Sequence, residues 1–265
     1  MKRFSLLLCI SLLLTLVSCS TGEQGKDPDA TGAEECQHQF VNNECACGAY
    51  QESEGLVFTE YVEGSYVCNG LGTCRDTCVV IPATYNGKPV DAFWPLTDEA
   101  HSQRIEKIVL PDSIKKISPQ AFRQMNRLKT VVLSKGINKL EEYTFYDCPA
   151  LEEIVIPKGV VTIERFCFQK CTALKTVVLP ETLREIKDYA FEGCTALETV
   201  TLPSSVCFLR YRAFSGCKLL QISFAGTKEQ FGNLRRENGW CRGIVSRVIT
   251  CSDGNYIVEE GKETT

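Results

Sequence analysis

The chain has 265 residues, of which 44% are hydrophobic, and it carries a formal net charge of -4. This length accommodates one extended domain with a leader and a tail. The hydrophobic fraction is typical of a globular chain. The acidic balance argues against nucleic acid or an anionic membrane surface as a partner recognised by charge.

Residues 1–18 read as a signal peptide. Lys2 and Arg3 precede an apolar run over residues 4–17 that is too short to span a bilayer. The run ends in a motif that resembles a lipobox, Leu16-Val17-Ser18-Cys19. A lipobox directs cleavage before its cysteine and attachment of lipid to the thiol, so we predict that Cys19 is the lipid attachment site. An ordinary signal peptide that ends near a cysteine is the alternative.

Two segments are expected between this anchor and the folded domain. Residues 19–35 contain no aromatic or large aliphatic residue, and they are predicted to form a flexible tether. Residues 36–55 hold a small cluster of possible metal ligands, Cys36, His38, Cys45 and Cys47. Three sulfurs and an imidazole are a ligand set for a structural zinc ion, the one cofactor that the sequence suggests. A small disulfide knot in an oxidising compartment is the alternative.

A repeat of 23 residues runs over residues 105–219. Five units follow one another without a gap, starting at Ile105, Leu128, Leu151, Leu174 and Leu197. Positions 1, 4, 6, 10, 13 and 18 of the units are apolar, and position 7 is proline in four of the five. One unit buries too little surface to fold alone, whereas stacked units cover one another. The period therefore predicts a solenoid in which the phenylalanines of position 18 share one interior: Phe122, Phe145, Phe168, Phe191 and Phe214.

The repeat motif resembles that of the BspA-like leucine-rich repeat family of bacterial surface proteins. In this chain it reads Val200-Thr201-Leu202-Pro203, Val206-Cys207-Phe208-Leu209 and Ala213-Phe214-Ser215-Gly216-Cys217. The resemblance covers nearly half of the chain, and it implies a curved solenoid that offers a binding or adhesion surface and is not an enzyme. Some members of the family carry a Cys-x-His, Cys-x-x-Cys-Gly insert before the repeats. This chain has one residue between Cys45 and Cys47 instead of two, which weakens the zinc interpretation.

The expected fold class is a leucine-rich-repeat solenoid of short stacked parallel strands, with turns and short helical segments, a β-rich N-terminal cap and an α/β C-terminal cap. The N-terminal cap is placed at residues 56–104. It is expected to contain a hairpin of two strands that turns at Gly64. A degenerate repeat should follow, with a strand over residues 79–81 but without the Ala-Phe and Cys positions of the full units.

The C-terminal cap is placed at residues 220–258, and residues 259–265 are a polar tail. Thr227 and Gln230 have the spacing of a capping box, which predicts a helix to about Arg236 with Phe231 facing inward. A strand over residues 244–250 should follow. Asp253 and Gly254 then offer a hairpin turn.

Most of the sixteen cysteines divide into groups by position. Position 21 carries either methionine or cysteine, so it requires a soft apolar side chain, and buried free thiols are expected at Cys148, Cys171, Cys194 and Cys217. Cys167 occupies a slot that is alanine in other units and is expected in the core, whereas Cys207 is expected to be exposed. In the caps, Cys68 with Cys78 and Cys241 with Cys251 are plausible disulfide pairs.

Positions 3 and 5 of each unit lie on the strand face that should point to solvent. Position 3 carries Lys107, Thr130, Glu153, Thr176 and Thr199, and position 5 carries Val109, Val132, Val155, Val178 and Thr201. The row of valines is either a contact strip or the floor under a second layer. The candidate binding surface consists of Lys107, Thr130, Glu153, Thr176, Thr199, Val132, Val155 and Val178.

These features predict an exported protein, anchored by lipid in the cell envelope at the outer membrane or cell surface. Its solenoid is expected to bind a protein or glycan, like an adhesin, without catalysis. No nucleic acid partner is expected, and the membrane is contacted only through the lipid. An envelope scaffold with no diffusible ligand is the alternative. A zinc-dependent or glycan hydrolase is a remote third, because the two histidines, His38 and His101, stand in no catalytic motif.

Overall fold

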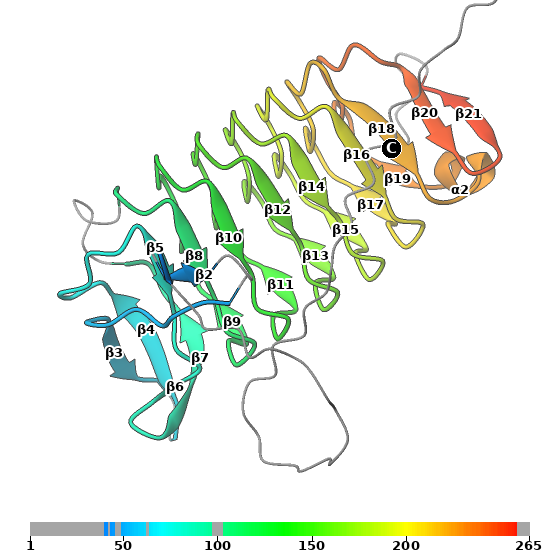
Figure 1. Ribbon diagram of the computed structural model, residues 1–265. Helices are drawn as coiled ribbons and strands as arrows, with labels where there is room; N and C mark the ends of the chain where they lie inside the picture. The colour runs from blue at the N-terminus through cyan, green and yellow to red at the C-terminus, as the bar shows by residue number, and fades with distance from the viewer. Residues whose placement is uncertain (1–39, 42, 46–48, 62–63, 97–102, 259–265) are drawn as a thin grey trace, which may run out of the picture.

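The structure, a computed structural model, describes residues 40–41, 43–45, 49–61, 64–96 and 103–258. These residues form a solenoid of short stacked strands with very little helix (Figure 1). The predicted leucine-rich-repeat solenoid is therefore confirmed. No helix in this part of the chain combines the length and hydropathy that crossing a membrane requires.

A nine-stranded sheet, the long sheet, runs the length of the solenoid (Figure 1). Its strands are β5 (Cys78–Val80), β8 (Lys107–Val109), β10 (Thr130–Val132), β12 (Glu153–Val155), β14 (Thr176–Val178), β16 (Thr199–Leu202), β18 (Gln221–Phe224), β20 (Val248–Cys251) and β21 (Gly254–Ile257). Every pair is parallel except the last, in which β21 turns back on β20. Within the repeats the partners are 23 residues apart, as for Thr130 beside Lys107.

A second parallel sheet lies on another side of the turns. It consists of β11 (Lys139–Leu140), β13 (Thr162–Ile163), β15 (Glu185–Ile186), β17 (Phe208–Leu209) and β19 (Arg235–Arg236). The first four of these strands contain position 13 of the second to fifth repeats, and its large apolar side chain is buried in each of them. From the second repeat to the fifth, each turn therefore contributes one strand to each sheet and an apolar side chain from each strand to the interior.

Proline ends the strand of the long sheet and starts the next turn. The carbonyl oxygen of Pro111 accepts a hydrogen bond from the backbone N–H of Ile114, and the prolines at the same position in three later units do the same. Proline has no N–H to continue a strand, so the chain leaves the sheet at this point. In the second unit Ser134 takes the position, and its buried hydroxyl donates to the carbonyl oxygen of Ile114, 2.6 Å away.

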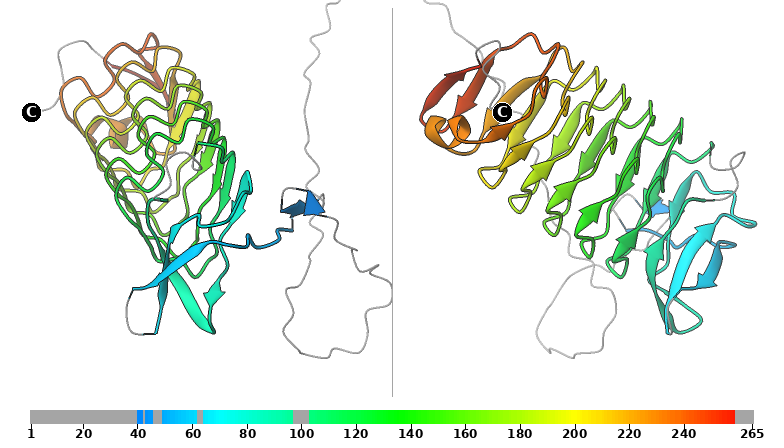
Figure 2. Two further views of the ribbon diagram at one scale, coloured as in Figure 1. Left: turned by 90° about the vertical axis from the view of Figure 1, so that its left-hand side faces the viewer. Right: turned by 180° about the vertical axis from the view of Figure 1, so that it is seen from behind.

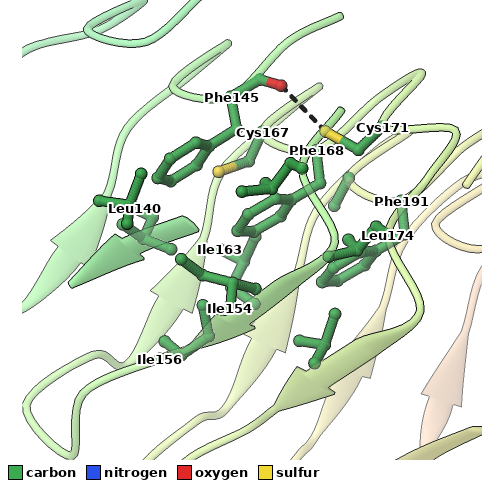
Figure 3. Packing of buried hydrophobic residues seen from close by; sticks show 14 of the residues in the cluster. Leu140, Phe145, Ile154, Ile156, Ile163, Cys167, Phe168, Cys171, Leu174 and Phe191 are labelled. Atoms are coloured by element: carbon green, nitrogen blue, oxygen red, sulfur yellow. Dashed lines mark hydrogen bonds between the residues drawn. The ribbon is translucent and has the colours of Figure 1, made fainter. Parts of the chain in front are cut away.

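The core is a column of stacked phenylalanine rings. The five phenylalanines of position 18 are fully buried, and their ring centroids are separated by 4.8 to 5.1 Å. Figure 3 shows Phe145, Phe168 and Phe191 on successive turns, with Leu140, Ile154 and Ile163 packed beside them. The predicted shared interior is confirmed.

The column begins one ring earlier than the sequence predicts. The unit before the first full repeat was expected to lack the Ala-Phe positions, but Phe93 is fully buried and stacks on Phe122 with centroids 5.1 Å apart. Phe93 reaches this place from a strand, β7 (Lys88–Phe93), and not from a turn. The expectation was wrong because a residue outside the repeat register can still place its ring in the same column.

The N-terminal cap is built around β3 (Val57–Glu60) and β4 (Tyr66–Gly70), which pair in antiparallel as the predicted hairpin. The strand β7 joins β4 in parallel and also pairs with β6 (Thr84–Tyr85) and β9 (Lys116–Ile117). A separate pair, β1 (Phe40–Val41) and β2 (Glu44–Cys45), stands outside the body of the solenoid (Figure 2, left).

In the C-terminal cap, α2 (Lys228–Gly232) opens with the predicted capping box between Thr227 and Gln230, and Phe231 is buried. The helix was expected to reach about Arg236 but ends at Gly232. Residues Arg235–Arg236 form β19, and the backbone N–H of Arg235 donates to the carbonyl oxygen of Cys207. These residues pair with β17, whose backbone N–H and C=O groups would otherwise lie unpaired at the end of the stack.

The cysteines of position 21 are buried thiols, as predicted, and so is Cys167. Cys207 is exposed. In the caps, Cys68, Cys78 and Cys251 are buried free thiols, so the two suggested disulfide pairs are not formed.

Candidate binding surface

The outer face of the long sheet is the most regular exposed surface of the described residues. Strands β12 and β14 have their middle residue buried and the residues on either side exposed. Positions 3 and 5 therefore form two columns across the strands, in register from turn to turn. The sequence prediction placed its candidate residues on this face, and the structure brings them together there.

Position 5 supplies an exposed apolar row. Val132 is 37% exposed, Val155 62% and Val178 50%, and the three lie on adjacent strands. We call these three residues the valine strip. The same column continues as Thr201 and Ser223, whose hydroxyl oxygens are 2.9 Å apart. The apolar part of the column therefore spans three turns and gives way to hydroxyl groups.

Val109 occupies the same column but is only 8% exposed. It forms a small apolar cluster with Cys78 and Val80, and the ring of Tyr50 packs against this cluster. The first turn of the column is therefore the floor under a second layer, whereas the next three turns are open. The interpretation as a floor under a second layer therefore holds at the first turn, and the contact strip stays a prediction for the next three turns.

The second layer is a segment that we call the N-terminal arm, residues 43–45 and 49–53. Two hydrogen bonds join Ser53 and Val80 across the contact. The Ser53 N–H donates to the Val80 carbonyl oxygen, and the Val80 N–H donates to the Ser53 hydroxyl. The Asn43 amide donates to the Cys78 carbonyl oxygen, 3.1 Å away, and to the Asp76 carboxylate, 2.6 Å away. These bonds hold the arm on the edge strand of the sheet.

Lys107 is the charged contact beneath the arm. Its ammonium group lies 2.9 Å from the carboxylate of Glu44 and 4.9 Å from the ring centroid of Tyr50. Partial burial opposes the charge of the ammonium group, but hydrogen bonds to Glu44 and Tyr50 outweigh this, so the pKa of Lys107 is raised. Lys107 was predicted as an open binding residue, and it is instead held within the molecule.

The rest of position 3 is open to solvent or half-buried. Thr130 is half-buried, and Glu153, Thr176 and Thr199 are exposed. Glu153 lies in register with Thr130 on one side and Thr176 on the other. Among the described residues no cation lies within ion-pair distance of Glu153.

The contribution of the arm could not be found by sequence reasoning. Tyr50, Glu44 and Asn43 lie before the repeats, where no periodicity relates them to a strand. An isolated aromatic residue in a polar stretch, as Tyr50 is, was the one available signal. It does not indicate which surface the ring covers.

A second row of aromatic side chains is structural. Tyr143, Phe166 and Tyr189 stack with centroids 4.7 and 4.9 Å apart and lie in the left-handed backbone region, with φ of 58 to 59°. Each inner ring face is covered by its neighbour, and Arg212 lies over the ring of Tyr189. The ring faces inside this row are therefore closed to a ligand.

The predicted zinc ligands and lipid site fall largely beyond the described residues. Cys19, Cys36, His38 and Cys47 lie outside them, as does the side chain of Cys45, whose backbone ends β2. The residues that the structure describes contain no group of three histidine, cysteine or acidic side chains placed to hold a metal ion. The zinc site and the lipid site both stay predictions.

Residues 100–221 match the family model described as BspA type Leucine rich repeat region (6 copies). No curated protein matches the chain. Among solved structures, the chain is similar to the T. pallidum leucine-rich repeat protein at 25% identity and a TM-score of 0.59, covering 65% of this chain and 81% of that one. It also resembles, in fold alone, a leucine rich cell surface protein from Faecalibacterium prausnitzii A2-165 at 20% identity and a TM-score of 0.50, covering 78% of this chain and 57% of that one. The described chain is thus a leucine-rich-repeat solenoid, and its residues 100–221 match the BspA type.

Proposed function

We propose that this chain is a non-catalytic binding protein of the cell envelope, adhesin-like, which holds a macromolecular partner on the outer face of the long sheet. The observation that carries the proposal is the valine strip. Three β-branched side chains on adjacent strands are 37 to 62% exposed, while the same column one turn earlier is covered by the arm. Apolar rows of this kind on a folded surface indicate a contact with another molecule.

The backbone under the strip is suited to recognition. Each strand is hydrogen-bonded to both neighbours, so the strip is preformed and a ligand loses no energy in ordering it. Extended faces of this kind are the surfaces that repeat proteins use for binding. An aliphatic strip flanked by threonines suits a protein partner better than a glycan, since the strip contains no aromatic ring on which a sugar could stack.

The envelope location is part of the proposal and rests on the sequence. The leader of residues 1–18 and the lipobox-like motif at Cys19 support export and lipid anchoring, and the BspA-type repeats support a surface location. Replacement of Cys19 by alanine should abolish incorporation of a labelled fatty acid and release the protein from the membrane fraction. Protease added to intact cells should digest the wild-type protein if it lies on the cell surface. Persistence of the fatty-acid label after the replacement would overturn the assignment of Cys19.

The binding test uses residues 20–265, which retain every described residue. The wild type is immobilised and exposed to matrix proteins and envelope extracts, and the retained proteins are identified and titrated. Val155→Asp should weaken binding about tenfold or more, because a charge at the centre of the strip would be desolvated by any partner. Val161→Asp is the matched control, since Val161 is 40% exposed but lies outside the long sheet.

Partners retained equally by the wild type and by Val155→Asp would show that the strip is not the binding face. If no partner is retained in repeated trials, the envelope scaffold becomes the better interpretation. A hydrolase activity in the same protein would overturn the non-catalytic assignment.

A further inference from the structure

The contact between the arm and the sheet shows what the outer face accepts. At the first turn an aromatic ring, Tyr50, covers the position 5 side chain Val109, and a carboxylate, Glu44, meets the position 3 cation Lys107. The Tyr50 ring also lies over the Lys107 ammonium group, 4.9 Å from its centroid, so the ring spans both columns while the Glu44 carboxylate meets column 3. Column 5 takes an apolar group, and column 3 takes a charge opposite to its own.

The same pair of columns continues onto the open part of the face with the charge reversed. Strand register places Thr130 beside Lys107 and Glu153 beside Thr130, so Glu153 stands two strands along from the cation in column 3. Val155 stands next to it in column 5, as Val109 does next to Lys107. The side-chain pattern beneath the arm thus recurs two turns later, with a carboxylate in place of an ammonium group and with none of the described residues lying over it.

The charges around Glu153 leave an acidic balance. The neighbouring Glu152 is exposed as well. Lys129, which directly precedes β10, forms an ion pair with Glu106 at 2.8 Å. Lys175 is the remaining cation beside this shallow depression of the face. Two carboxylates therefore face one uncommitted cation.

We propose that the valine strip and Glu153 recognise a protein segment that carries an aromatic or large aliphatic side chain close to a lysine or arginine. The partner would be the charge-reversed counterpart of Tyr50 and Glu44 in the arm. This inference rests on the proposed function and specifies the chemistry of its partner. A lysine or arginine would reach Glu153, where a charge-assisted hydrogen bond can form, while the apolar side chain covers Val155.

The spacing of the two columns defines the partner further. Positions 3 and 5 are two residues apart on a strand, or about 6.6 Å. An extended ligand presents its own side chains on one face at the same interval. The expected recognition element is therefore an apolar residue and a basic residue separated by one residue.

The test is a selection from a displayed library of random twelve-residue peptides on residues 20–265. Wild-type protein should enrich peptides with an aromatic or large aliphatic residue two positions from lysine or arginine. Binding of these peptides should fall about tenfold or more in Val155→Asp and in Glu153→Lys, and should be unchanged in Val161→Asp. It should also weaken as salt is raised, because the pair is near the surface.

The sharpest readout is the charge swap. A new selection on Glu153→Lys should enrich the apolar residue together with aspartate or glutamate, which would reproduce the arm contact at Lys107. Glu153→Gln should remove the charge preference in both directions while the apolar preference remains. Circular dichroism and the thermal midpoint of each variant establish that the fold is intact.

Peptides that depend on Val155 but show no preference for a basic residue would overturn the partner chemistry and leave the proposed function standing. Peptides that bind the wild type and Val155→Asp equally would overturn both. Enrichment of acidic peptides on the wild type would also overturn this inference, since it would assign the charge contact to Lys175 and not to Glu153.

Discussion

The thiol of Cys171 donates a hydrogen bond to the carbonyl oxygen of Phe145, 3.1 Å away on the preceding turn (Figure 3). Cys148, Cys194 and Cys217 make the same bond to the phenylalanine carbonyls of Phe122, Phe168 and Phe191. The cysteines are therefore more than small apolar fillers. Each one adds a side-chain hydrogen bond between neighbouring turns. The carbonyl oxygens of Phe122, Phe168 and Phe191 also accept a backbone N–H from the residue three positions later.

These thiols should be chemically inert in the folded protein. Burial raises the pKa of the Cys148 thiol to about 12, and it raises the pKa values of Cys171 and Cys194 well above their usual range. Alkylation with iodoacetamide at pH 8, followed by peptide mass spectrometry, should therefore modify the exposed Cys207 and leave these three unmodified until denaturant is added. Labelling of Cys171 at the rate of Cys207 would contradict the packing described above.

Glu164 should contribute to stability in a pH-dependent way. Glu164 is 5% exposed. Its carboxylate accepts hydrogen bonds from the Lys187 ammonium group at 2.8 Å and forms an ion pair with Lys139 at 3.1 Å. Burial opposes ionisation, but these two cations outweigh it, so the pKa of Glu164 is lowered. A carboxyl group of this kind stabilises the fold above its unfolded pKa of about 4.3 and loses that effect as the pH falls through the lower folded value.

The substitution Glu164→Gln should therefore lower the free energy of unfolding by about 1–3 kcal/mol at neutral pH. The difference from the wild type should shrink as the pH falls below about 4. Urea denaturation at several pH values measures both effects. Glu153→Gln is the matched control and should change stability little, because Glu153 is exposed. A deficit that stayed constant down to acid pH would show that the ion pairs are not its source.

Truncation of two adjacent residues on β12 should change stability to very different extents. Ile154 is 2% exposed in the core, whereas Val155 is 62% exposed on the valine strip. Ile154→Ala should lower the free energy of unfolding by about 2–5 kcal/mol through lost burial and a cavity. Val155→Ala should change it by about 0.5 kcal/mol or less. Chemical denaturation of both variants checks the strand register, and equal losses would contradict it.

Removal of the Tyr50 ring should uncover the first turn of the face. Tyr50→Ala exposes Val109 and is expected to lower the free energy of unfolding by about 1 kcal/mol. Hydrogen exchange should quicken at the backbone amides of Gln51 and Ser53, which are bonded to Asn43 and Val80. Tyr211→Ala is the control, because Tyr211 is 39% exposed and lies among the later turns. Unchanged exchange at Gln51 and Ser53 would show that the ring does not hold the arm.

The interior could be predicted from the sequence because the same positions of each 23-residue unit must carry buried apolar side chains. Phe145 and Phe168 meet the same surroundings, so a single rule accounts for both and for their neighbours. The place of Phe93 in the ring column was not predicted, because Phe93 lies on a strand of the cap and outside the repeat register. The end of α2 was also missed, because the residues after it pair with β17, in which Phe208 lies beside Arg235.

The candidate site shows the limit of the same logic. Val109 and Val132 have equivalent positions in the repeat, yet one is 8% and the other 37% exposed. The difference arises from the arm, which contacts the sheet at Lys107 and Val80 through side chains that belong to no repeat. Periodicity describes what each unit offers to its neighbour. It carries no information on what lies over the open face.

The parallel register of the long sheet, with partners 23 residues apart, has a consequence for how such a molecule can change in length. Every unit presents the next with nearly the same surface that it receives from the one before. A tandem duplication of one unit in the gene would therefore lengthen the solenoid by about 4.8 Å and leave both caps unchanged. The length of the solenoid and the number of its binding positions can thus change by whole repeat units, with little effect on folding.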